Sequence, residues 1–271
     1  MLEHEFVRNA YLAGTFIALA CGAVGWFVVL RAQVFAGDAL SHVAFVGAIA
    51  AAVLGLDERI GVLVLTLAVA AGLATLGRRG QADDVAIGIV FAWTLGIGIL
   101  LITLLASSAG GEQGITAVNA LFGSIYSLTA SAARLAAAVA LAVIAGVLIA
   151  FRPLLLSTLD AELAVVRGVP VRLLGGLFLA LLALVTAEST QAVGALLLLG
   201  LLAAPAGAAH ELTASPLRGL ALSALFAALA MWGGLALSYA VGSLPPSSAI
   251  VGLAASGYLM ATLRTRWRSD E

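Results

Sequence analysis

Apolar side chains run along this chain in long stretches, and short polar segments separate them. Most stretches approach the roughly 20 residues that a helix needs to cross the hydrocarbon core of a bilayer. They lack the alternation of apolar and polar residues that is typical of a transmembrane barrel. The nine stretches cover residues 10–30, 32–56, 60–77, 85–106, 131–150, 173–188, 191–209, 219–241 and 248–263. The pattern predicts an all-α, polytopic membrane protein with about eight or nine transmembrane helices.

The composition supports this class and indicates a single domain. Of the 271 residues, 63% are hydrophobic and 10% are charged, whereas soluble domains carry about 25% charged residues. The mean hydropathy is +1.15. Since no low-complexity linker or soluble insert divides the chain, we expect residues 1–271 to form one transmembrane domain in contact with lipid. The net charge of −1, without a basic cluster, argues against a nucleic-acid partner.

Several enzyme classes do not fit the sequence. All 13 basic residues are arginine, so the chain lacks the lysine of a GxxxxGK[ST] phosphate-binding loop, and we expect any ATP hydrolysis from a separate chain. One cysteine, Cys21, rules out a thiolate metal cluster. The residues before Asp38 are FAG and those before Ser256 are AA, which match neither the GxGD nor the GxSG pattern of intramembrane proteases. The chain is therefore not expected to be an enzyme.

The most informative polar residues are Asp38 and His42, which stand four positions apart within an apolar stretch. At this spacing both side chains lie on one face of a helix. An aspartate at the centre of a membrane helix costs about 2.5–3.5 kcal/mol, so such residues usually serve a function. A carboxylate with an imidazole suits zinc, manganese or ferrous iron, and the pair does not decide among them. A satisfied hydrogen-bonded pair that only specifies packing is the alternative.

Two ligands do not complete a metal shell, because zinc takes about four and manganese up to six. Either other helices of this chain contribute, or a second copy brings its own Asp38 and His42 to a shared axis. Ser41 is adjacent to His42 and can support either arrangement through a hydrogen bond.

Glu188 has two interpretations that the sequence leaves open. It lies between two apolar stretches, beside Ser189, Thr190 and Gln191. If residues 173–209 form two helices, Glu188 belongs to a solvated outer turn. If they form one interrupted element, Glu188 lies in a cavity and can hold a cation.

Residues 157–170 predict a short amphipathic helix in a polar connection. Ser157 or Thr158 can cap its start, acidic residues follow in the first turn, and Gly168 ends it before Pro170. Such a helix is typical of a docking element for a partner protein. An ordinary surface loop is the alternative.

The distribution of arginine predicts the orientation, since cytoplasmic loops are enriched in basic residues. With the N-terminus outside, the outer side holds three arginines and the inner side ten, in a chain that ends in an arginine-rich tail. The inner set is Arg31, Arg78, Arg79, Arg152, Arg167, Arg172, Arg218, Arg264, Arg266 and Arg268, and the outer set is Arg8, Arg59 and Arg134. We therefore expect an outer N-terminus and a cytoplasmic C-terminus.

Six motifs, in this order, resemble the integral-membrane permeases of bacterial zinc and manganese ABC uptake systems, the ABC-3 type of metal permease. They are GDALSH at 37–42, DDVAIGIVFAW at 83–93, LFGS at 121–124, LDAELAVVRGVPVRLL at 159–174, QAVGALLLLGLLAAPAGAA at 191–209 and LPPSSAIV at 244–251. No single motif suffices, but together they cover almost the whole chain.

The resemblance implies a cobalamin-importer-like (type II) ABC permease that works as a homodimer in the bacterial plasma membrane. An ATPase subunit would bind ATP on the cytoplasmic side, and an extracellular metal-binding protein would deliver Zn²⁺ or Mn²⁺ for transport, with no permanently bound cofactor. The metal pathway falls on Asp38 and His42, and the ATPase-coupling helix on about Leu159–Gly168. The expected coupling residues are Asp160, Glu162, Arg167 and Gly168. Glu188 departs from the small or apolar residue of many relatives.

A proton-coupled secondary metal transporter is the main rival. In it Asp38, His42 and Glu188 would relay protons, and uptake would proceed without an ATPase. The sequence shows no clear inverted repeat of the kind that many secondary transporters carry.

Overall fold

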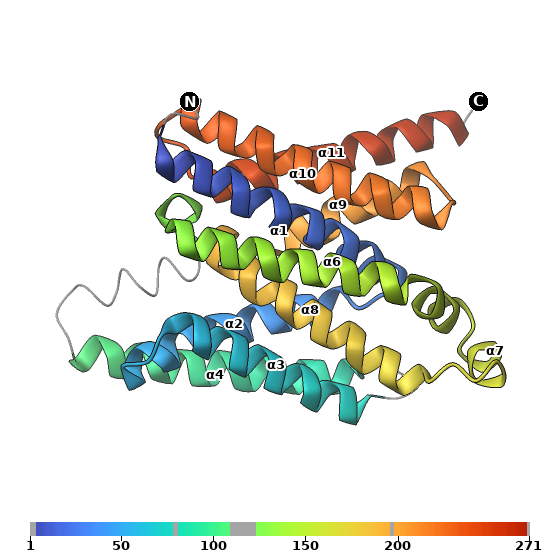
Figure 1. Ribbon diagram of the computed structural model, residues 1–271, viewed down its shortest axis with the longest axis horizontal. Helices are drawn as coiled ribbons and strands as arrows, with labels where there is room; N and C mark the ends of the chain where they lie inside the picture. Colours follow the sequence, from blue (N-terminus) through green and yellow to red (C-terminus); the bar gives the residue numbers. More distant parts are fainter. Residues whose placement is uncertain (1–3, 78–80, 109–122, 196–197, 270–271) are drawn as a thin grey trace.

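The computed structural model describes residues 4–77, 81–108, 123–195 and 198–269 of the chain. These residues form a bundle of long helices that run roughly along one direction (Figure 1). The elements are α1 (Glu5–Leu30), α2 (Val34–Leu54), α3 (Glu58–Leu76), α4 (Asp84–Ser108), the 3₁₀ turn η1 (Ile125–Ser127), α6 (Ala130–Leu159), α7 (Ala161–Val166), α8 (Val171–Val193), α9 (Leu198–Leu212), α10 (Pro216–Ala240) and α11 (Pro246–Ser269).

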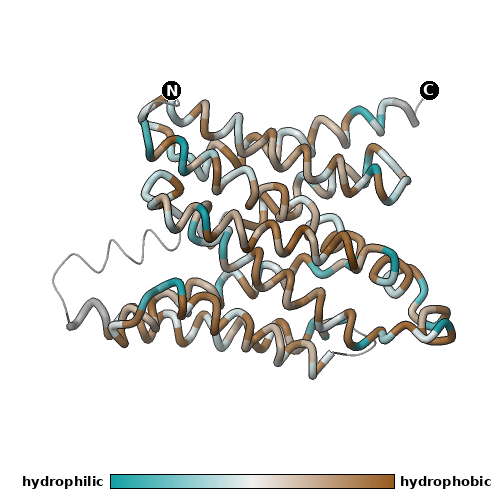
Figure 2. The backbone as a smooth tube through the Cα atoms, viewed as in Figure 1, coloured by the Kyte–Doolittle hydropathy of each residue, from teal (hydrophilic) through white to brown (hydrophobic). Residues whose placement is uncertain are grey.

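Eight helices in the described part of the chain are long and apolar enough to cross a membrane. They are α1, α2, α3, α4, α6, α8, α10 and α11. The ninth apolar stretch forms α9, whose 15 residues extend about 22 Å at 1.5 Å per residue. Hydrophobic residues occupy most of each helix, and hydrophilic ones lie mostly toward the two ends of the bundle (Figure 2). The prediction of an all-α membrane protein with about eight or nine helices is confirmed.

Several predicted boundaries differ from the structure, and the largest shift is at the end of α6. The stretch expected to end near residue 150 continues as α6 to Leu159, with Pro153 inside the helix. Proline is tolerated there because neighbouring groups in a membrane bundle can satisfy the freed carbonyl. Ser157 and Thr158 thus belong to α6, and the expectation that one of them caps the next helix is wrong. The stretch 107–130 falls mainly outside the described residues.

The central helix of the bundle is α1, which is almost fully buried over its second half. It packs against α6, α8, α9 and α10, while α2 packs against α3, α4 and α8. Glycine permits the closest of these contacts. A Cβ atom at Gly47 of α2 would lie only 2.6 Å from the carbonyl oxygen of Gly61 on α3, so only hydrogen fits between the two backbones.

Different elements lie at the two ends of the bundle. At one end Asn9 Nδ2 donates to the carbonyl oxygen of Leu128, which places the start of α1 beside η1. At the other end His210 Nε2 donates to the carbonyl oxygen of Trp26, near the last turn of α1. The N- and C-termini lie at opposite ends, and α7 projects at the end where the C-terminus lies (Figure 1).

Candidate functional site

Asp38 and His42 lie in the first turns of α2, on one face of the helix, as their spacing predicts. His42 Nδ1 is 3.0 Å from the backbone carbonyl oxygen of Asp38 and 3.9 Å from its carboxylate oxygen Oδ1. A carbonyl oxygen can only accept, so Nδ1 carries the proton in this hydrogen bond. The other ring nitrogen, Nε2, then has the free lone pair that metal ligation requires.

Ser41 supports this geometry. Its hydroxyl donates to the Asp38 carbonyl oxygen at 2.7 Å and lies 3.3 Å from His42 Nδ1. The ring of His42 also meets the ring of Phe91 on α4 edge-on, with centroids 4.9 Å apart. The imidazole is therefore held by its own helix on one side and by α4 on the other.

The carboxylate of Asp38 faces a cavity of about 350 Å³ between α2 and α4. The side chain of Asp38 is 28% exposed and that of His42 is 13% exposed, so neither is sealed in the protein core. The lining residues are Phe35, Asp38, Asp84, Ile87, Gly88 and Phe91. A cation that enters this cavity meets Asp38 directly.

Asp84 is a second carboxylate on this cavity, and it is not among the site residues that the sequence predicts. It begins α4, and Ile87, Gly88 and Phe91 follow it at helical spacing on the same face. An acidic residue at the start of a very apolar stretch was the available signal. What the sequence did not reveal is that α4 packs against α2, which brings Asp84 to the cavity of Asp38.

The described residues of one chain do not supply a complete metal shell. Within the described ranges, no group of three or more His, Cys, Asp and Glu side chains is arranged to hold a metal ion. The predicted metal site at Asp38 and His42 would need further ligands from water, from backbone oxygens or from another chain.

Glu188 lies inside α8 and is 2% exposed, so the interpretation as a solvated turn is wrong. Its carboxylate oxygen Oε2 is 2.6 Å from Arg59 Nη2 of α3. The same Arg59 nitrogen is 3.4 Å from the carbonyl oxygen of Ala132 on α6. The cation beside Glu188 in this structure is thus a guanidinium, and a metal role for Glu188 stays a prediction that would require its displacement.

The short helix α7 forms where the docking element was predicted, but Asp160 caps it. The Asp160 carboxylate accepts from the backbone N–H of Leu163 at 2.8 Å. Gly168 follows with φ +75°, a conformation that favours glycine. Asp160, Glu162, Arg167 and Gly168 are all exposed. Apolar side chains are exposed beside them, at 66% for Leu159 and 84% for Val166.

The sequence profile of the ABC 3 transport family matches residues 3–265, nearly the full length of the chain. The chain belongs to this family. A curated relative, the manganese import system permease protein ScaB of Streptococcus parasanguinis, is 33% identical to it over 247 residues. That alignment covers 89% of this chain and 86% of the relative.

Two solved structures share the fold of this ABC 3 family member. One chain of PsaBC from Streptococcus pneumoniae, solved in complex with Fab, has a TM-score of 0.82 and 32% sequence identity, and the match covers 96% of this chain and 92% of that one. A metal-chelate type ABC transporter in an inward-facing conformation has a TM-score of 0.74 over 95% of this chain and 85% of that one. At 16% identity the second comparison shows the fold alone. The predicted family and permease fold are confirmed.

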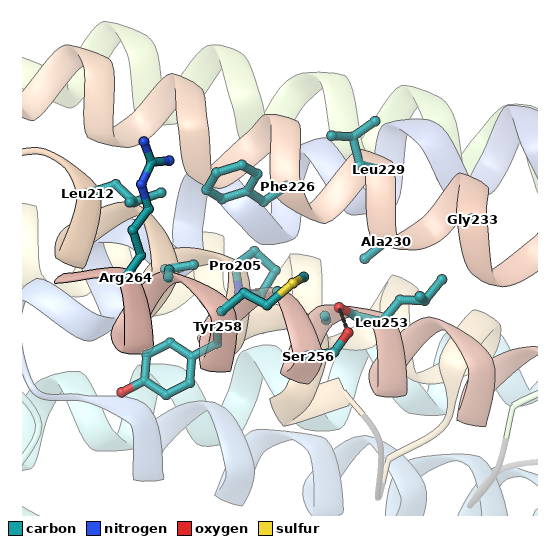
Figure 3. A pocket seen from close by; sticks show the side chains of 15 residues that line it. Pro205, Leu212, Phe226, Leu229, Ala230, Gly233, Leu253, Ser256, Tyr258 and Arg264 are labelled. Carbon is teal, nitrogen blue, oxygen red and sulfur yellow. Dashed lines mark hydrogen bonds between the residues drawn. The ribbon is translucent and has the colours of Figure 1, made fainter. Parts of the chain in front are cut away.

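A larger cavity of this ABC 3 family member, about 510 Å³, lies among α9, α10 and α11 (Figure 3). Its walls are mostly apolar, with Phe226, Leu229 and Leu253 among them, and its one charged lining residue is Arg264. A guanidinium does not suit a metal cation. The Asp38 cavity is also mostly apolar, but its charged lining residues are two carboxylates, which suit a cation better.

Proposed function

We propose that this chain is the membrane permease of an ATP-driven importer of a divalent metal, with Mn²⁺ as the favoured cargo and Zn²⁺ as the alternative. Membership of the ABC 3 family and the relative named as a manganese import permease support the proposal. Two carboxylates at the cavity, with the imidazole of His42 beside Asp38, also suit manganese, which accepts oxygen ligands readily.

The observation that carries the proposal is the state of the Asp38–His42 pair. The Nδ1 atom of His42 is hydrogen-bonded within its own helix, which leaves Nε2 available to a metal ion. Asp38 belongs to the same membrane-spanning helix and lines the cavity between α2 and α4. A partly exposed pair of this kind can bind a cation and release it again. Asp84 offers a second carboxylate at the same cavity, so the cation need not leave one negative charge before it meets another.

A homodimer would complete the site. One chain offers too few ligands in its described part, and a second copy would add another Asp38 and His42. A neutral imidazole and an ionised carboxylate from each copy would give four ligands around a shared axis, within the range that manganese and zinc accept.

The two ends of the bundle would bind different partners. The exposed apolar and charged side chains of α7 suit a protein surface rather than solvent, and we assign them to the ATPase subunit. The opposite end, with the start of α1 and η1, would face outward and receive the metal from an extracellular binding protein. This arrangement agrees with the arginine distribution, which predicts a cytoplasmic C-terminus.

The test is uptake of Mn²⁺ into proteoliposomes that contain the permease, its ATPase and its binding protein. We expect ATP-dependent uptake that Asp38→Asn abolishes. Asp57→Asn is the matched control, because Asp57 caps α3 outside the cavity and asparagine caps a helix equally well.

Different outcomes contradict different parts of the proposal. Full uptake by Asp38→Asn would rule out the pathway role of Asp38. Uptake of equal rate without ATP and without the ATPase would favour the proton-coupled secondary transporter. A preference for Zn²⁺ in competition with Mn²⁺ would show that Zn²⁺ is the transported ion, and the proposed mechanism would still hold.

A further inference from the structure

Arg31 occupies the short connection between α1 and α2 and is buried, with 6% of its surface exposed. Burial lowers the pKa of Arg31 to about 10, which leaves the guanidinium charged at neutral pH. A buried charge needs strong partners. The connection is also tight, because Ala32 has φ +55° although it is not glycine.

Three partners of Arg31 lie on α6 and α8. Its Nε donates to Thr158 Oγ1 at 2.9 Å, and its Nη2 donates to Ser157 Oγ at 3.2 Å. The guanidinium also lies over the ring of Phe178 on α8, 4.8 Å from the ring centroid. Three helices thus meet at one side chain.

The position of Thr158 gives this contact its importance. α6 ends at Leu159, and Asp160 then both ends α6 and caps α7. Arg31 therefore holds the last turn of the helix that leads directly into α7. A displacement of α7 that reaches the last turn of α6 would act on Arg31 through these hydrogen bonds.

On its other side Arg31 is joined to the first turn of α2. The Gln33 N–H donates to the Val28 carbonyl oxygen, and the Gln33 carbonyl oxygen accepts from the N–H of Ala36 at 3.1 Å. The connection is thus hydrogen-bonded to the end of α1 and to the start of α2. Asp38 follows in the next turn of α2, so a movement of Arg31 reaches the carboxylate through about two turns of helix.

We propose that Arg31 is a positioning residue that transmits the movement of α7, driven by the ATPase, to the Asp38–His42 pair on α2. The inference rests on the proposed function. The planar guanidinium suits this task because it binds two hydroxyl oxygens and a ring face in one fixed arrangement, which an ammonium group cannot do.

The test measures transport and ATP hydrolysis together, in proteoliposomes with the ATPase and the binding protein. For Arg31→Lys and for Thr158→Val we expect the Mn²⁺ transported per ATP to fall about tenfold, as for residues coupled by direct contact. ATP hydrolysis should stay within about twofold of the unmodified protein, because α7 itself is unchanged. In the double variant Arg31→Lys with Thr158→Val, the Mn²⁺ transported per ATP should be no lower than in either single variant.

Thr158→Ser keeps the hydroxyl and should retain tight coupling, which makes it the matched control for Thr158→Val. Arg152→Lys controls for the loss of an arginine, since Arg152 is an exposed residue of α6, the helix that also carries Thr158. The two Thr158 variants also keep the test decisive if Arg31→Lys fails to fold.

Transport and hydrolysis that fall in proportion would assign Arg31 a purely structural role and overturn the inference. Unchanged transport per ATP, or additive losses in the double variant, would overturn it too. In these cases the unmodified protein still shows ATP-dependent uptake, so the proposed function survives. Absence of that uptake in the unmodified protein overturns the proposed function and this inference with it.

Discussion

In the described helices of this permease, the Asp38–His42 pair and the Arg59–Glu188 pair have different surroundings. The Asp38–His42 pair joins neighbouring turns of one helix and is partly exposed at a cavity. The Arg59–Glu188 pair joins two helices far apart in sequence, at 2.6 Å, with Glu188 almost fully buried. The first pair has ligand atoms available for a cation, whereas the second has already neutralised its own charge.

The difference separates two uses of charge inside a membrane protein. A carboxylate with an opposite charge beside it holds helices together, and here Arg59 and Glu188 connect α3 to α8 and, through Ala132, to α6. A carboxylate at a cavity can serve a passing ion. Burial and the identity of the neighbour, rather than the residue type, distinguish the two.

The largest effect is expected from Arg59→Met. It leaves the Glu188 carboxylate buried without its partner, which costs about 3–5 kcal/mol. The melting temperature of the purified permease in detergent should fall sharply. The double variant Arg59→Met with Glu188→Leu should recover most of the loss, because it removes both charges. A double variant as unstable as Arg59→Met would show that Arg59 acts through contacts other than Glu188.

The next effect is expected from His42→Gln, which removes the nitrogen that we propose as a metal ligand. Uptake of Mn²⁺ should fall about a hundredfold, the upper end of what loss of a supporting group costs a metal site. The melting temperature should stay within a few degrees of the unmodified value, because His42 is held mainly by its own helix. His210→Gln is the control histidine, since His210 stacks on Trp26 away from the cavity. A large loss of stability with full specific uptake would make His42 a packing residue.

A smaller effect is expected from Asp84→Asn. Asp84 lies on the cavity but on another helix than the ligand pair, so we expect uptake to fall about tenfold, equivalent to about 1.4 kcal/mol. Uptake assays at several Mn²⁺ concentrations will show whether the loss is in affinity or in rate. Asp83→Asn is the neighbouring control, because Asp83 caps α4 by accepting from the Val85 N–H. Equal losses in both variants would assign the effect to helix α4 rather than to the cavity.

The smallest effect is expected from Ser41→Ala. The Asp38 carbonyl oxygen still accepts from His42 Nδ1 when the hydroxyl is gone, so uptake should fall only about twofold. The same proteoliposome assay measures it. A loss as large as that of His42→Gln would show that the hydroxyl, and not the carbonyl oxygen, sets the orientation of the ring.

Much of the fold could be predicted because a membrane helix is specified by local properties. The stretch marked at 32–56 forms α2 over Val34–Leu54, since an apolar segment of that length has to bury its backbone polar groups within itself. α7 begins a few residues after the start that the sequence predicts. Both Thr158 and Asp160 are suitable caps, and only the continuation of α6 through Pro153 selects Asp160.

The partners across the bundle could not be predicted. Arg59 and Glu188 are 129 positions apart, and nothing local to either indicates the other. Asp84 likewise reaches the cavity only because α4 packs against α2.

The sequence by itself determined the membrane class, the helical segments and the shared face of Asp38 and His42, because these depend on hydropathy and on the 3.6-residue period of one helix. Tertiary structure alone decided which charged side chains stay available to bind a cation. Packing placed Arg59 against Glu188 and Arg31 against Thr158, and left Asp38 at a cavity with Asp84. The energy of a buried charge depends on the atoms around it, and those atoms come from distant parts of the chain.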